Sequence, residues 1–424
     1  MTGDPRADVL GYLDDHVTDM AEMLCELVRT PSVSGSDEEN GIQSALAGRL
    51  SGWGLDIDHW AIDLPVTAGS PDFPGMEVDR SEAWGLVGRV PGAAAGRSLM
   101  LNSHVDVVPP GDPAAWTAGP FAATARGGDI VGRGACDMKG GLVAAMWAVR
   151  ALLATGVRLD GDLMLACVQG EEDGGLGTFA LTQRGWRADA CVIPEPTSLD
   201  LVPASAGSLT FRLTVRGLAT HASRRSRGVS AIEKFLPIFR GLRDLEAVRN
   251  ASPDPLMARW DLPYPIEIGR TYAGDWSSSV PDVLVAEGRF GVALGEDVST
   301  AKAAFEEAIA AVCTSDDWLR DHPVDVEWWG GQFASGATPA DADIVGAVAR
   351  AHAAVSSRPQ QMWGAPYGSD LRLMRRLGVP TVHYGPGDVS LAHGPDERVP
   401  MAEVKTAAQA IALLAIDFCG PTAD

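Results

Sequence analysis

Basic residues are scarce in this sequence, and long uncharged apolar runs are missing from it. Lysine and arginine total 34 against 56 aspartates and glutamates, which gives a formal net charge of −22. A charge of this sign argues against a nucleic-acid-binding protein and against binding to an anionic membrane surface. No uncharged stretch reaches the roughly 18 residues of a membrane-spanning helix, and the N-terminus lacks the pattern of a signal peptide.

Cysteine pairs at metal-binding or redox spacing are also missing. The chain has 6 cysteines, none of them in a CxxC arrangement, and most stand inside apolar runs. This pattern predicts buried free thiols rather than disulfides, and hence a reducing compartment. We therefore expect a cytoplasmic protein that has neither nucleic acid nor a membrane as its partner.

The length of 424 residues exceeds what one compact core usually organises, so we expect two domains. From residue 98, apolar strand patterns alternate with helical ones, as in "SLMLNSHVDVV" followed by "KGGLVAAMWAVRALLATG". Such alternation predicts an α/β fold with a mainly parallel sheet and helices on both of its faces. This main domain is expected to comprise residues 1–206 and, after an insertion, residues 327–424.

The segment between these two parts, residues 207–326, has a different pattern. Its strands alternate between apolar and polar residues, as in "GSLTFRLTVRG" and "VLVAEGRFGVAL", which suits a sheet with one face in water. Each of these strands is followed by a helical run. We expect an inserted α+β domain here.

Side chains that can bind a metal gather where the predicted strands of the main domain end. In open α/β sheets, ligands bind at the carboxyl ends of the strands. The residues delivered to that edge, or to the loops beside it, are His104, Asp106, Asp137, Glu171, Glu172, Glu195 and His393. Taken alone, each has an ordinary explanation as a surface, turn or helix-start residue. Because all are predicted at one edge of the sheet, a shared site explains them better than independent solvated charges do.

The residue types point to a metal site. Two imidazoles and several carboxylates without a thiolate suit zinc, with manganese or cobalt as alternatives. One ion would use three or four of these ligands, whereas two ions about 3.5 to 4 Å apart need a bridging carboxylate and use them all. Three carboxylates and one bridging hydroxide would balance the charge of two divalent cations. The metal would make that hydroxide available by lowering the pKa of water from about 15.7 to roughly 7.

Six stretches of the chain match one known family in sequence and in order: "SHVDVVPPG", "GRGACDMKGG", "QGEEDGGLGT", "IPEPT", "GLATHAS" and "LAHGPDERV". On these stretches the sequence resembles the M20 metallopeptidase family, most closely its branch of acetylornithine deacetylases and succinyl-diaminopimelate desuccinylases. The resemblance implies a catalytic domain formed by residues 1–206 and 327–424. It also implies that residues 207–326 form a lid, which in addition makes the interface of a homodimer.

The resemblance implies two zinc ions and a ligand set for each. His104 and Glu195 match the ligands of one ion. Glu172 and His393 match those of the other, and Asp137 matches the bridge between them. The family commonly has a cis peptide bond after the bridging aspartate, which is the bond before Met138 in this chain.

Catalytic roles follow from the same resemblance. Glu171 matches the general base. Asp106, two residues beyond His104 and so on the same side of the strand, matches the carboxylate that orients and polarises that imidazole. His221 in "ATHAS" matches a lid histidine that reaches the active site of the partner subunit and stabilises the tetrahedral oxyanion.

Substrate contacts are implied as well, together with two departures from the family pattern. Arg289 in "AEGRFGV" and Arg372 in "GSDLRLM" match positions that help to hold a substrate carboxylate, which a guanidinium group can bind through two hydrogen bonds. Relatives often have an asparagine where this chain has Ser279, and commonly an acidic residue where it has Gly170. The polar groups that face the substrate are therefore expected to differ from those of the best-known deacylases.

These observations lead to three hypotheses. The first is a two-zinc amidohydrolase that removes an N-acyl group from an amino acid or a related small molecule, and Glu195 rather than an aspartate at this position resembles deacylases and carboxypeptidases. The second is a dipeptidase or carboxypeptidase with the same residues, because both reactions cleave an amide beside a carboxylate. The third is a non-catalytic binding module on the same fold, whose expected mark, a lost ligand or base, is missing here.

Overall fold

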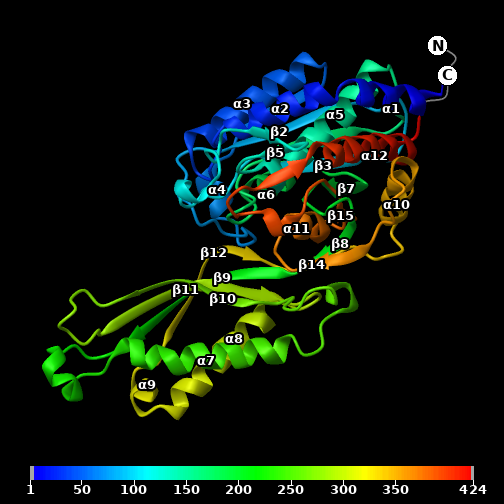
Figure 1. The fold of residues 1–424 in the computed structure, drawn as a ribbon. Coiled ribbons are helices and arrows are strands. Elements are labelled where there is room, and N and C mark those ends of the chain that lie inside the picture. The colour runs from blue at the N-terminus through cyan, green and yellow to red at the C-terminus, as the bar shows by residue number, and fades with distance from the viewer. Residues whose placement is uncertain (1–3, 422–424) are drawn as a thin grey trace. The chain divides into compact units, whose positions relative to one another are not determined.

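The computed structural model describes residues 4–421, which form two compact units. The first unit combines the chain up to Ala204 with Ala337–Trp363 and the chain from Leu373 onward, and the second combines Ser205–Gly336 with Gly364–Arg372. Figure 1 labels the helices and strands of each unit. The roles that the sequence assigns to the two parts of the chain, catalysis for one and a lid with a dimer interface for the other, stay predictions.

The longer helices of the first unit surround a large sheet. Their bounds are α1 (Pro5–Asp15), α2 (Val17–Arg29), α3 (Asp37–Gly52), α5 (Gly140–Ala154), α6 (Leu176–Gln183), α10 (Asp343–Val355) and α12 (Met401–Cys419). His16, which has a φ of −114° and a ψ of 23°, separates α1 from α2. α3 begins after Ser36, whose side chain caps the helix by accepting a hydrogen bond from the backbone N–H of Glu39.

The large sheet has nine strands within residues 4–421, eight of them in the order β1-β2-β6-β3-β7-β15-β8-β13, with β14 beside β8. The strands are β1 (Asp56–Ala61), β2 (Trp84–Val90), β3 (Leu99–His104), β6 (Leu163–Val168), β7 (Ala190–Ile193), β8 (Leu201–Ser205), β13 (Gly336–Ala337), β14 (Met362–Ala365) and β15 (Thr381–His383). The central strands β6, β3, β7 and β15 are parallel, whereas β1 and β2 on one side and β8 on the other pair antiparallel. The predicted mainly parallel sheet is confirmed, with antiparallel strands added toward its edges.

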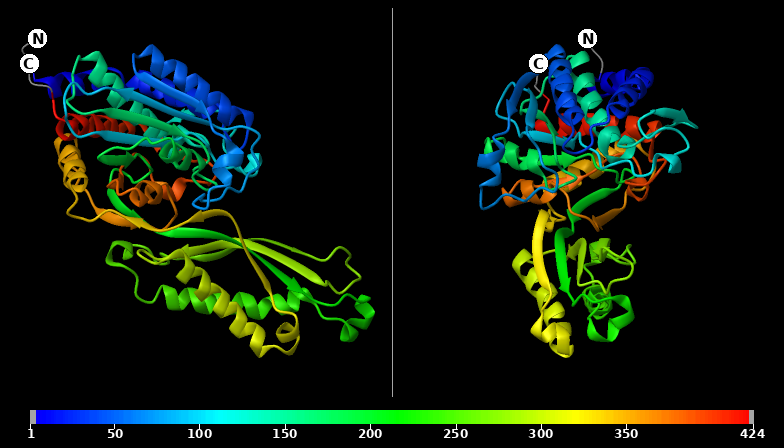
Figure 2. Two further views of the ribbon diagram at one scale, coloured as in Figure 1. Left: turned by 180° about the vertical axis from the view of Figure 1, so that it is seen from behind. Right: turned by 90° about the vertical axis from the view of Figure 1, so that its left-hand side faces the viewer.

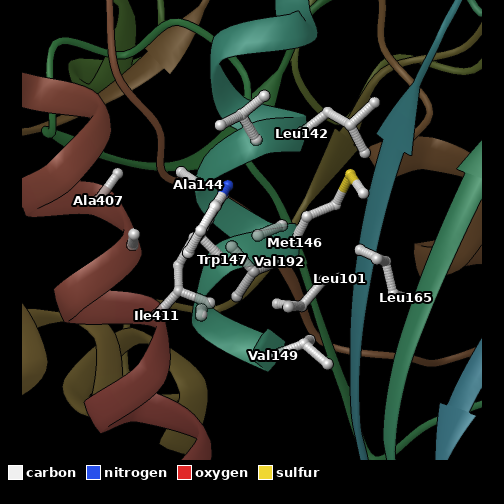
Figure 3. Packing of buried hydrophobic residues seen from close by; sticks show 14 of the residues in the cluster. Leu101, Leu142, Ala144, Met146, Trp147, Val149, Leu165, Val192, Ala407 and Ile411 are labelled. Atoms are coloured by element: carbon white, nitrogen blue, oxygen red, sulfur yellow. The ribbon is translucent and has the colours of Figure 1, made fainter. Parts of the chain in front are cut away.

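Helices cover both faces of this sheet. Leu101 and Leu165 point to α5, which lies between these strands and α12 (Figure 3). On the opposite face, the side-chain amide of Asn102 donates a hydrogen bond to Thr178 of α6 at 2.9 Å. Strands that are covered on both faces can be apolar at every position, which is why they read as continuous apolar runs in the sequence. The prediction of helices on both faces is confirmed.

A small antiparallel sheet lies next to the candidate site. It has the order β16-β5-β4, and its strands are β4 (Thr124–Arg126), β5 (Asp129–Val131) and β16 (Arg398–Pro400). Arg398 pairs with Val131, so the segment that carries His393 is joined to the segment that leads into Asp137. Two parts of the chain that are far apart in sequence are held together in this way.

The second unit is built on a four-stranded antiparallel sheet with the order β10-β11-β9-β12. Its main elements are β9 (Gly207–Arg216), α7 (Ala231–Arg249), β10 (Ile266–Ala273), β11 (Val283–Val292), α8 (Val298–Ser315), α9 (Asp317–Asp321) and β12 (Asp325–Phe333). α7 and α8 cover one face of the sheet, as both views of Figure 2 show. Phe211, Phe290 and Phe305 form the centre of its own hydrophobic core. This arrangement confirms the predicted α+β character of the segment and adds β10 and β12.

The remaining helical segments are short: α4 (Leu64–Ala68), α11 (Leu371–Arg376), a π-helical turn η2 (Ala135–Lys139), and the 3-10 turns η1 (Pro113–Ala115), η3 (Ala222–Arg227), η4 (Pro255–Met257) and η5 (Val389–Leu391). No helix within residues 4–421 is both long and apolar enough to cross a bilayer. The six cysteines are free thiols, five of them buried and Cys25 partly exposed.

Candidate metal centre

Strand ends bring residues of the site to one edge of the large sheet. β3 ends at His104 and β6 ends at Val168, and these two residues are partners in the parallel register. Glu195 follows two residues after the end of β7. The carboxyl ends of three neighbouring parallel strands thus carry His104, the turn of Glu171 and Glu172, and Glu195 to one place.

Asp137 lies in the turn η2 that precedes α5. The peptide bond between Asp137 and Met138 is cis, as the family resemblance implies. The carboxylate of Glu397 accepts hydrogen bonds from the backbone N–H groups of Cys136 at 2.9 Å and of Asp137 at 3.0 Å. Glu397 therefore fixes the backbone from which the Asp137 carboxylate projects.

Arg133 links the same carboxylate to His393. Arg133 forms a buried ion pair with Glu397 and donates a hydrogen bond to the backbone carbonyl of His393 at 3.0 Å. His393 has a φ of 62°, in the left-handed region that residues other than glycine rarely adopt. Such conformations persist where surrounding contacts enforce them, and they concentrate at functional sites.

Asp137 stands between the two imidazoles. Its Oδ1 lies 3.1 Å from Nε2 of His104, and its Oδ2 lies 3.4 Å from Nε2 of His393. Glu172 lies 3.2 Å from Nε2 of His393, and Glu195 lies 3.8 Å from Nε2 of His104. The five side chains therefore form two groups that share Asp137, one group at each of its carboxylate oxygens.

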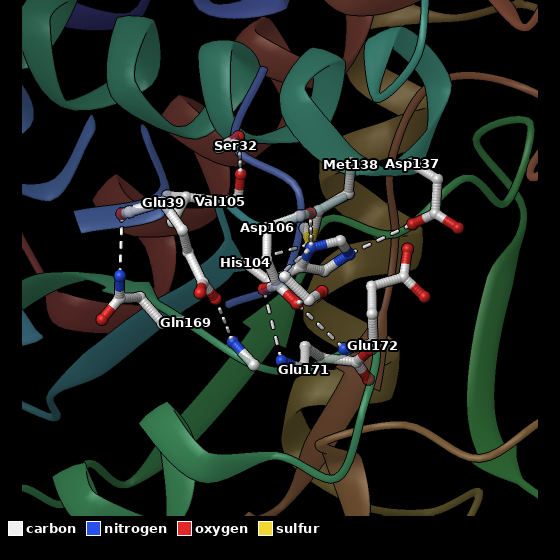
Figure 4. Close-up of polar contacts among 12 residues, drawn as sticks. Ser32, Glu39, His104, Val105, Asp106, Asp137, Met138, Gln169, Glu171 and Glu172 are labelled. Atoms are coloured by element: carbon white, nitrogen blue, oxygen red, sulfur yellow. Dashed lines mark hydrogen bonds and ion pairs between the residues drawn. The ribbon is translucent and has the colours of Figure 1, made fainter. Parts of the chain in front are cut away.

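This donor set fits divalent metal ions. One ligand atom each from His104, Asp137 and Glu172 lies within 4.8 Å of the others, and Figure 4 shows the Glu172 carboxylate reaching toward Asp137 and the His104 imidazole. Nitrogen and oxygen donors without a thiolate are ligands for zinc, cobalt or manganese. A carboxylate whose two oxygens face two separate groups of ligands has the arrangement that a bridging ligand requires.

The charges of the site favour a cation. Burial raises the pKa of Glu195 well above its usual value, and the charge of Asp137 raises it further. Burial would lower the pKa of His104, but its hydrogen bond to Asp137 and the charge of Glu195 outweigh burial and raise it. Burial likewise would raise the pKa of Asp137, and the two histidines hold it below its usual range instead. Bound metal ions would supply the positive charge that these buried carboxylates lack.

Asp106 connects His104 to the two adjacent glutamates. Its backbone carbonyl lies 2.9 Å from Nδ1 of His104, and its carboxylate lies 3.7 Å from the same nitrogen. Because a carbonyl can only accept, Nδ1 carries the hydrogen and Nε2 keeps its lone pair for a metal. The Asp106 carboxylate accepts from the backbone N–H groups of Glu171 at 3.3 Å and of Glu172 at 3.2 Å. Its pKa is raised to about 7 by burial.

Sequence reasoning missed Glu397 and Arg133 although both lie beside recognised motifs. Glu397 belongs to "LAHGPDERV", and Arg133 belongs to "GRGACDMKGG". Each is buried and carries a charge opposite to that of the other. A basic and an acidic residue inside two motifs that already supply ligands is the signal that could have predicted the pair.

The three candidate residues of the second unit have well-defined places within that unit. His221 caps η3, is exposed, and has its Nδ1 2.8 Å from Oγ of Ser223. An isolated antiparallel bridge pairs His221 with Ser279, the residue that stands where relatives often have asparagine. This departure therefore lies next to the candidate oxyanion residue.

The two candidate arginines differ in their surroundings. Arg289 lies in β11 opposite Thr210 of β9 and is partly exposed. Arg372 is buried, donates a hydrogen bond to the backbone carbonyl of Ser369 at 2.7 Å, and has its guanidinium carbon 3.9 Å from the ring centre of Phe333. Stacking and hydrogen bonding hold the Arg372 fork in one orientation.

Comparison with known proteins identifies the family. The model of peptidase family M20/M25/M40 matches residues 100–417. The chain belongs to this family. It is 30% identical to the succinyl-diaminopimelate desuccinylase of Gluconacetobacter diazotrophicus, over 93% of this chain and 95% of that protein. It is 26% identical to the N-formyl-4-amino-5-aminomethyl-2-methylpyrimidine deformylase of Bacillus subtilis, over 96% of each chain.

A solved structure shows the same fold. An M20 family metallo-carboxypeptidase from Sulfolobus solfataricus superimposes with a TM-score of 0.73 at 16% identity, over 94% of this chain and 98% of that one. The M20 chain described here is a metal-dependent hydrolase of amide C–N bonds, and its relatives include deacylases and peptidases.

Proposed function

We propose that this M20 hydrolase is a two-zinc deacylase that removes an N-acyl group from an amino acid or a related small molecule. The observation that carries the proposal is the position of Asp137, whose two oxygens lie 3.1 Å from His104 and 3.4 Å from His393. Two relatives that match nearly the whole chain are a desuccinylase and a deformylase, which favours deacylation over peptide cleavage.

The metal site would be held by five residues of the first unit: His104, Asp137, Glu172, Glu195 and His393. Two bound divalent cations would supply Lewis acidity, polarising the substrate carbonyl and lowering the pKa of water at the site. In this proposal Glu171 takes a proton from the attacking water and returns it to the leaving amine. Asp106 keeps the backbone of Glu171 in place through the hydrogen bond to its N–H.

Residues of the second unit complete the proposed reaction. His221 donates a hydrogen bond to the oxyanion of the tetrahedral intermediate. Arg289 and Arg372 bind the carboxylate of the substrate, a task that suits the planar fork of a guanidinium group. Substrates of this class are small molecules that carry both an amide and a carboxylate.

A homodimer and a cytoplasmic location are part of the proposal. Ile232, Leu236 and Val248 of α7 are 44%, 49% and 74% exposed, which supports an interface formed by the second unit. Light scattering of the purified protein measures the oligomeric state. The cysteine spacing in the sequence supports the cytoplasm.

The deciding experiment combines a metal analysis with a substrate panel. The purified protein is assayed for bound metal, then incubated with N-formyl, N-acetyl and N-succinyl amino acids and, in parallel, with dipeptides. Hydrolysis of the acyl amino acids with two zinc ions per chain supports the proposal. Turnover of dipeptides alone would make the protein a peptidase with the same residues. If the protein held no metal and added zinc or cobalt produced no amide hydrolysis, a binding function would replace catalysis.

A further inference from the structure

A buried group of three charges lies beside the adjacent glutamates. The Arg80 side chain is 1% exposed, and the side chains of Glu39 and Asp173 are 1% and 5% exposed. Arg80 donates to both oxygens of Asp173, at 2.7 and 3.0 Å, and to both oxygens of Glu39, each at 3.2 Å. One guanidinium group therefore joins two carboxylates that are far apart in sequence.

The two carboxylates also accept hydrogen bonds from the backbone, and these bonds fix the turn before and after the glutamate pair. Glu39 accepts a hydrogen bond from the N–H of Gly170 at 3.1 Å, directly before Glu171. Asp173 directly follows Glu172 and accepts from the N–H groups of Glu77 at 3.1 Å and Val78 at 3.0 Å. The turn that carries the two glutamates is thus held at both ends, and Arg80 connects the two holds.

The same contacts account for the glycine at position 170. Gly170 has a φ of 67°, and a Cβ atom there would lie 3.1 Å from Oδ1 of Asp173 and 3.2 Å from a terminal nitrogen of Arg80. Little room is left for a side chain, and the left-handed backbone disfavours one. Arg80 and Asp173 fill the space into which an acidic residue at 170, common in relatives, would project.

Three buried charges are a weak source of stability, because desolvation offsets most of their mutual attraction. Breaking such a group is costly, however, and the group tolerates only one geometry. Beside the two glutamates, the group of three charges can restrict the turn of residues 170–173 to a single conformation. In that conformation the N–H groups of Glu171 and Glu172 both meet Asp106.

We propose that Arg80 is a positioning residue, which acts with Glu39 and Asp173 to set the turn of residues 170–173 so that Glu171 and Glu172 point in their working directions. The roles of the two glutamates rest on the proposed function. The conformation of the turn does not, so it provides a separate readout.

The test replaces Arg80 by methionine in the metal-loaded enzyme. We expect kcat to fall about 10- to 100-fold with KM nearly unchanged, since a misplacement of about 1 Å at a catalytic group costs up to about 100-fold. We also expect faster hydrogen exchange at the amides of residues 170–172, measured by mass spectrometry, with unchanged exchange in β3 and α5. A purely structural role would raise exchange throughout the unit without lowering kcat, and that result would overturn the proposal.

A matched control is Arg249→Met. Arg249 and Glu296, both in the second unit, form a two-point pair, and their side chains are 10% and 16% exposed. We expect this variant to keep kcat within about twofold of the wild type and to leave exchange at 170–172 unchanged. An equal loss of kcat in both variants would contradict a specific role of Arg80.

If Arg80→Met does not fold, Arg80→Lys decides. Lysine keeps the charge and the aliphatic stem but cannot span both carboxylates with a planar fork. Lower kcat with faster exchange at 170–172 supports the proposal, and wild-type values of both overturn it. Should the wild-type protein hydrolyse no amide at all, the proposed function fails, whereas the exchange measurement still decides whether Arg80 sets the turn.

Discussion

His104 of the first unit and His221 of the second unit differ in how they are held. In the first unit His104, Asp106 and Glu195 are at most 4% exposed, and direct contacts join His104 to both carboxylates. In the second unit His221 is exposed, and its ring contacts Ser223 of its own segment. The residues of the candidate metal centre therefore all belong to one unit.

A metal ligand and a residue that stabilises an oxyanion have different structural requirements. Metal ligands must meet within a few tenths of an ångström, and buried ion pairs and backbone hydrogen bonds enforce this. In the proposed reaction His221 must reach the oxyanion of the substrate and still leave room for the substrate to enter. An exposed histidine at the start of a short turn suits that second task. Variants in each unit should therefore fail in different ways.

The largest effect is expected from Glu171→Gln. The amide cannot accept a proton, so kcat should fall about 10³-fold while the metal content stays at the wild-type value. Kinetics at saturating substrate together with metal analysis of the same sample check this. The paired variant Glu172→Gln removes a carboxylate that lies 3.2 Å from His393, and it should lose metal. Equal metal content and equal activity in the two variants would contradict the separate roles of the adjacent glutamates.

The next effect is expected from His221→Ala, which should lower kcat about 100-fold and leave the metal content unchanged, because it removes one donor to the oxyanion. Mixing this variant with Glu171→Gln tests whether His221 acts across subunits. Each variant alone would keep at most about 1% of wild-type activity. Random mixed dimers would contain one intact site each, and the mixture would recover up to about a quarter of wild-type activity. No recovery after verified subunit exchange would place His221 in the active site of its own chain.

The candidate metal ligands and Arg80 differ in how far the sequence could predict them. The candidate metal ligands His104, Glu172 and Glu195 lie at or shortly after the ends of apolar strands, so the strand pattern places them at one edge before any contact is known. Arg80 belongs to no such pattern. It lies in a loop, and its partners Glu39 and Asp173 are 41 and 93 residues away. Pairing over such distances depends on the folded chain, so sequence periodicity does not reveal it.

Local irregularity explains the strands that were not predicted. β10 has a register shift between Ile268 and Arg270, and β12 has one between Trp328 and Gln332. Each shift lies at glycine residues in the sequence, which break the alternation of apolar and polar side chains. The regular strands β9 and β11 lack such shifts in their pairing with each other and were predicted from their alternation.

A smaller effect is expected from Arg372→Lys in the second unit. Lysine lacks the fork that binds a carboxylate through two hydrogen bonds, so KM for an N-acyl amino acid should rise about 10- to 30-fold with little change in kcat. An analogue with a carboxamide in place of the carboxylate should show almost no difference between variant and wild type. If KM rises equally for both compounds, Arg372 supports the unit through Ser369 and Phe333 rather than binding the substrate.

The smallest effect concerns the pH dependence of stability. It compares how burial and carboxylate neighbours change the pKa of two histidines in the first unit. His383 is completely buried, and burial lowers its pKa to about 3. His104 is almost as buried, yet its carboxylate neighbours raise its pKa. Because His383 is neutral in the folded protein and has a pKa of about 6.5 when unfolded, the unfolded state binds more protons between these two values. Stability should therefore fall as the pH drops through this window.

The variant His383→Asn removes this titration. Between pH 7 and pH 5.5 the wild type should lose about 1.3 kcal/mol more unfolding free energy than the variant does, as calculated from the two pKa values. Urea unfolding of both proteins at the two pH values measures the difference, and metal release affects both alike because His383 is outside the ligand set. An equal pH dependence would mean that His383 has nearly the same pKa in the folded and the unfolded protein. Burial alone would then not lower the pKa of a histidine in this unit. The opposite pKa shifts of His383 and His104 could no longer be assigned to burial in one case and to carboxylate neighbours in the other.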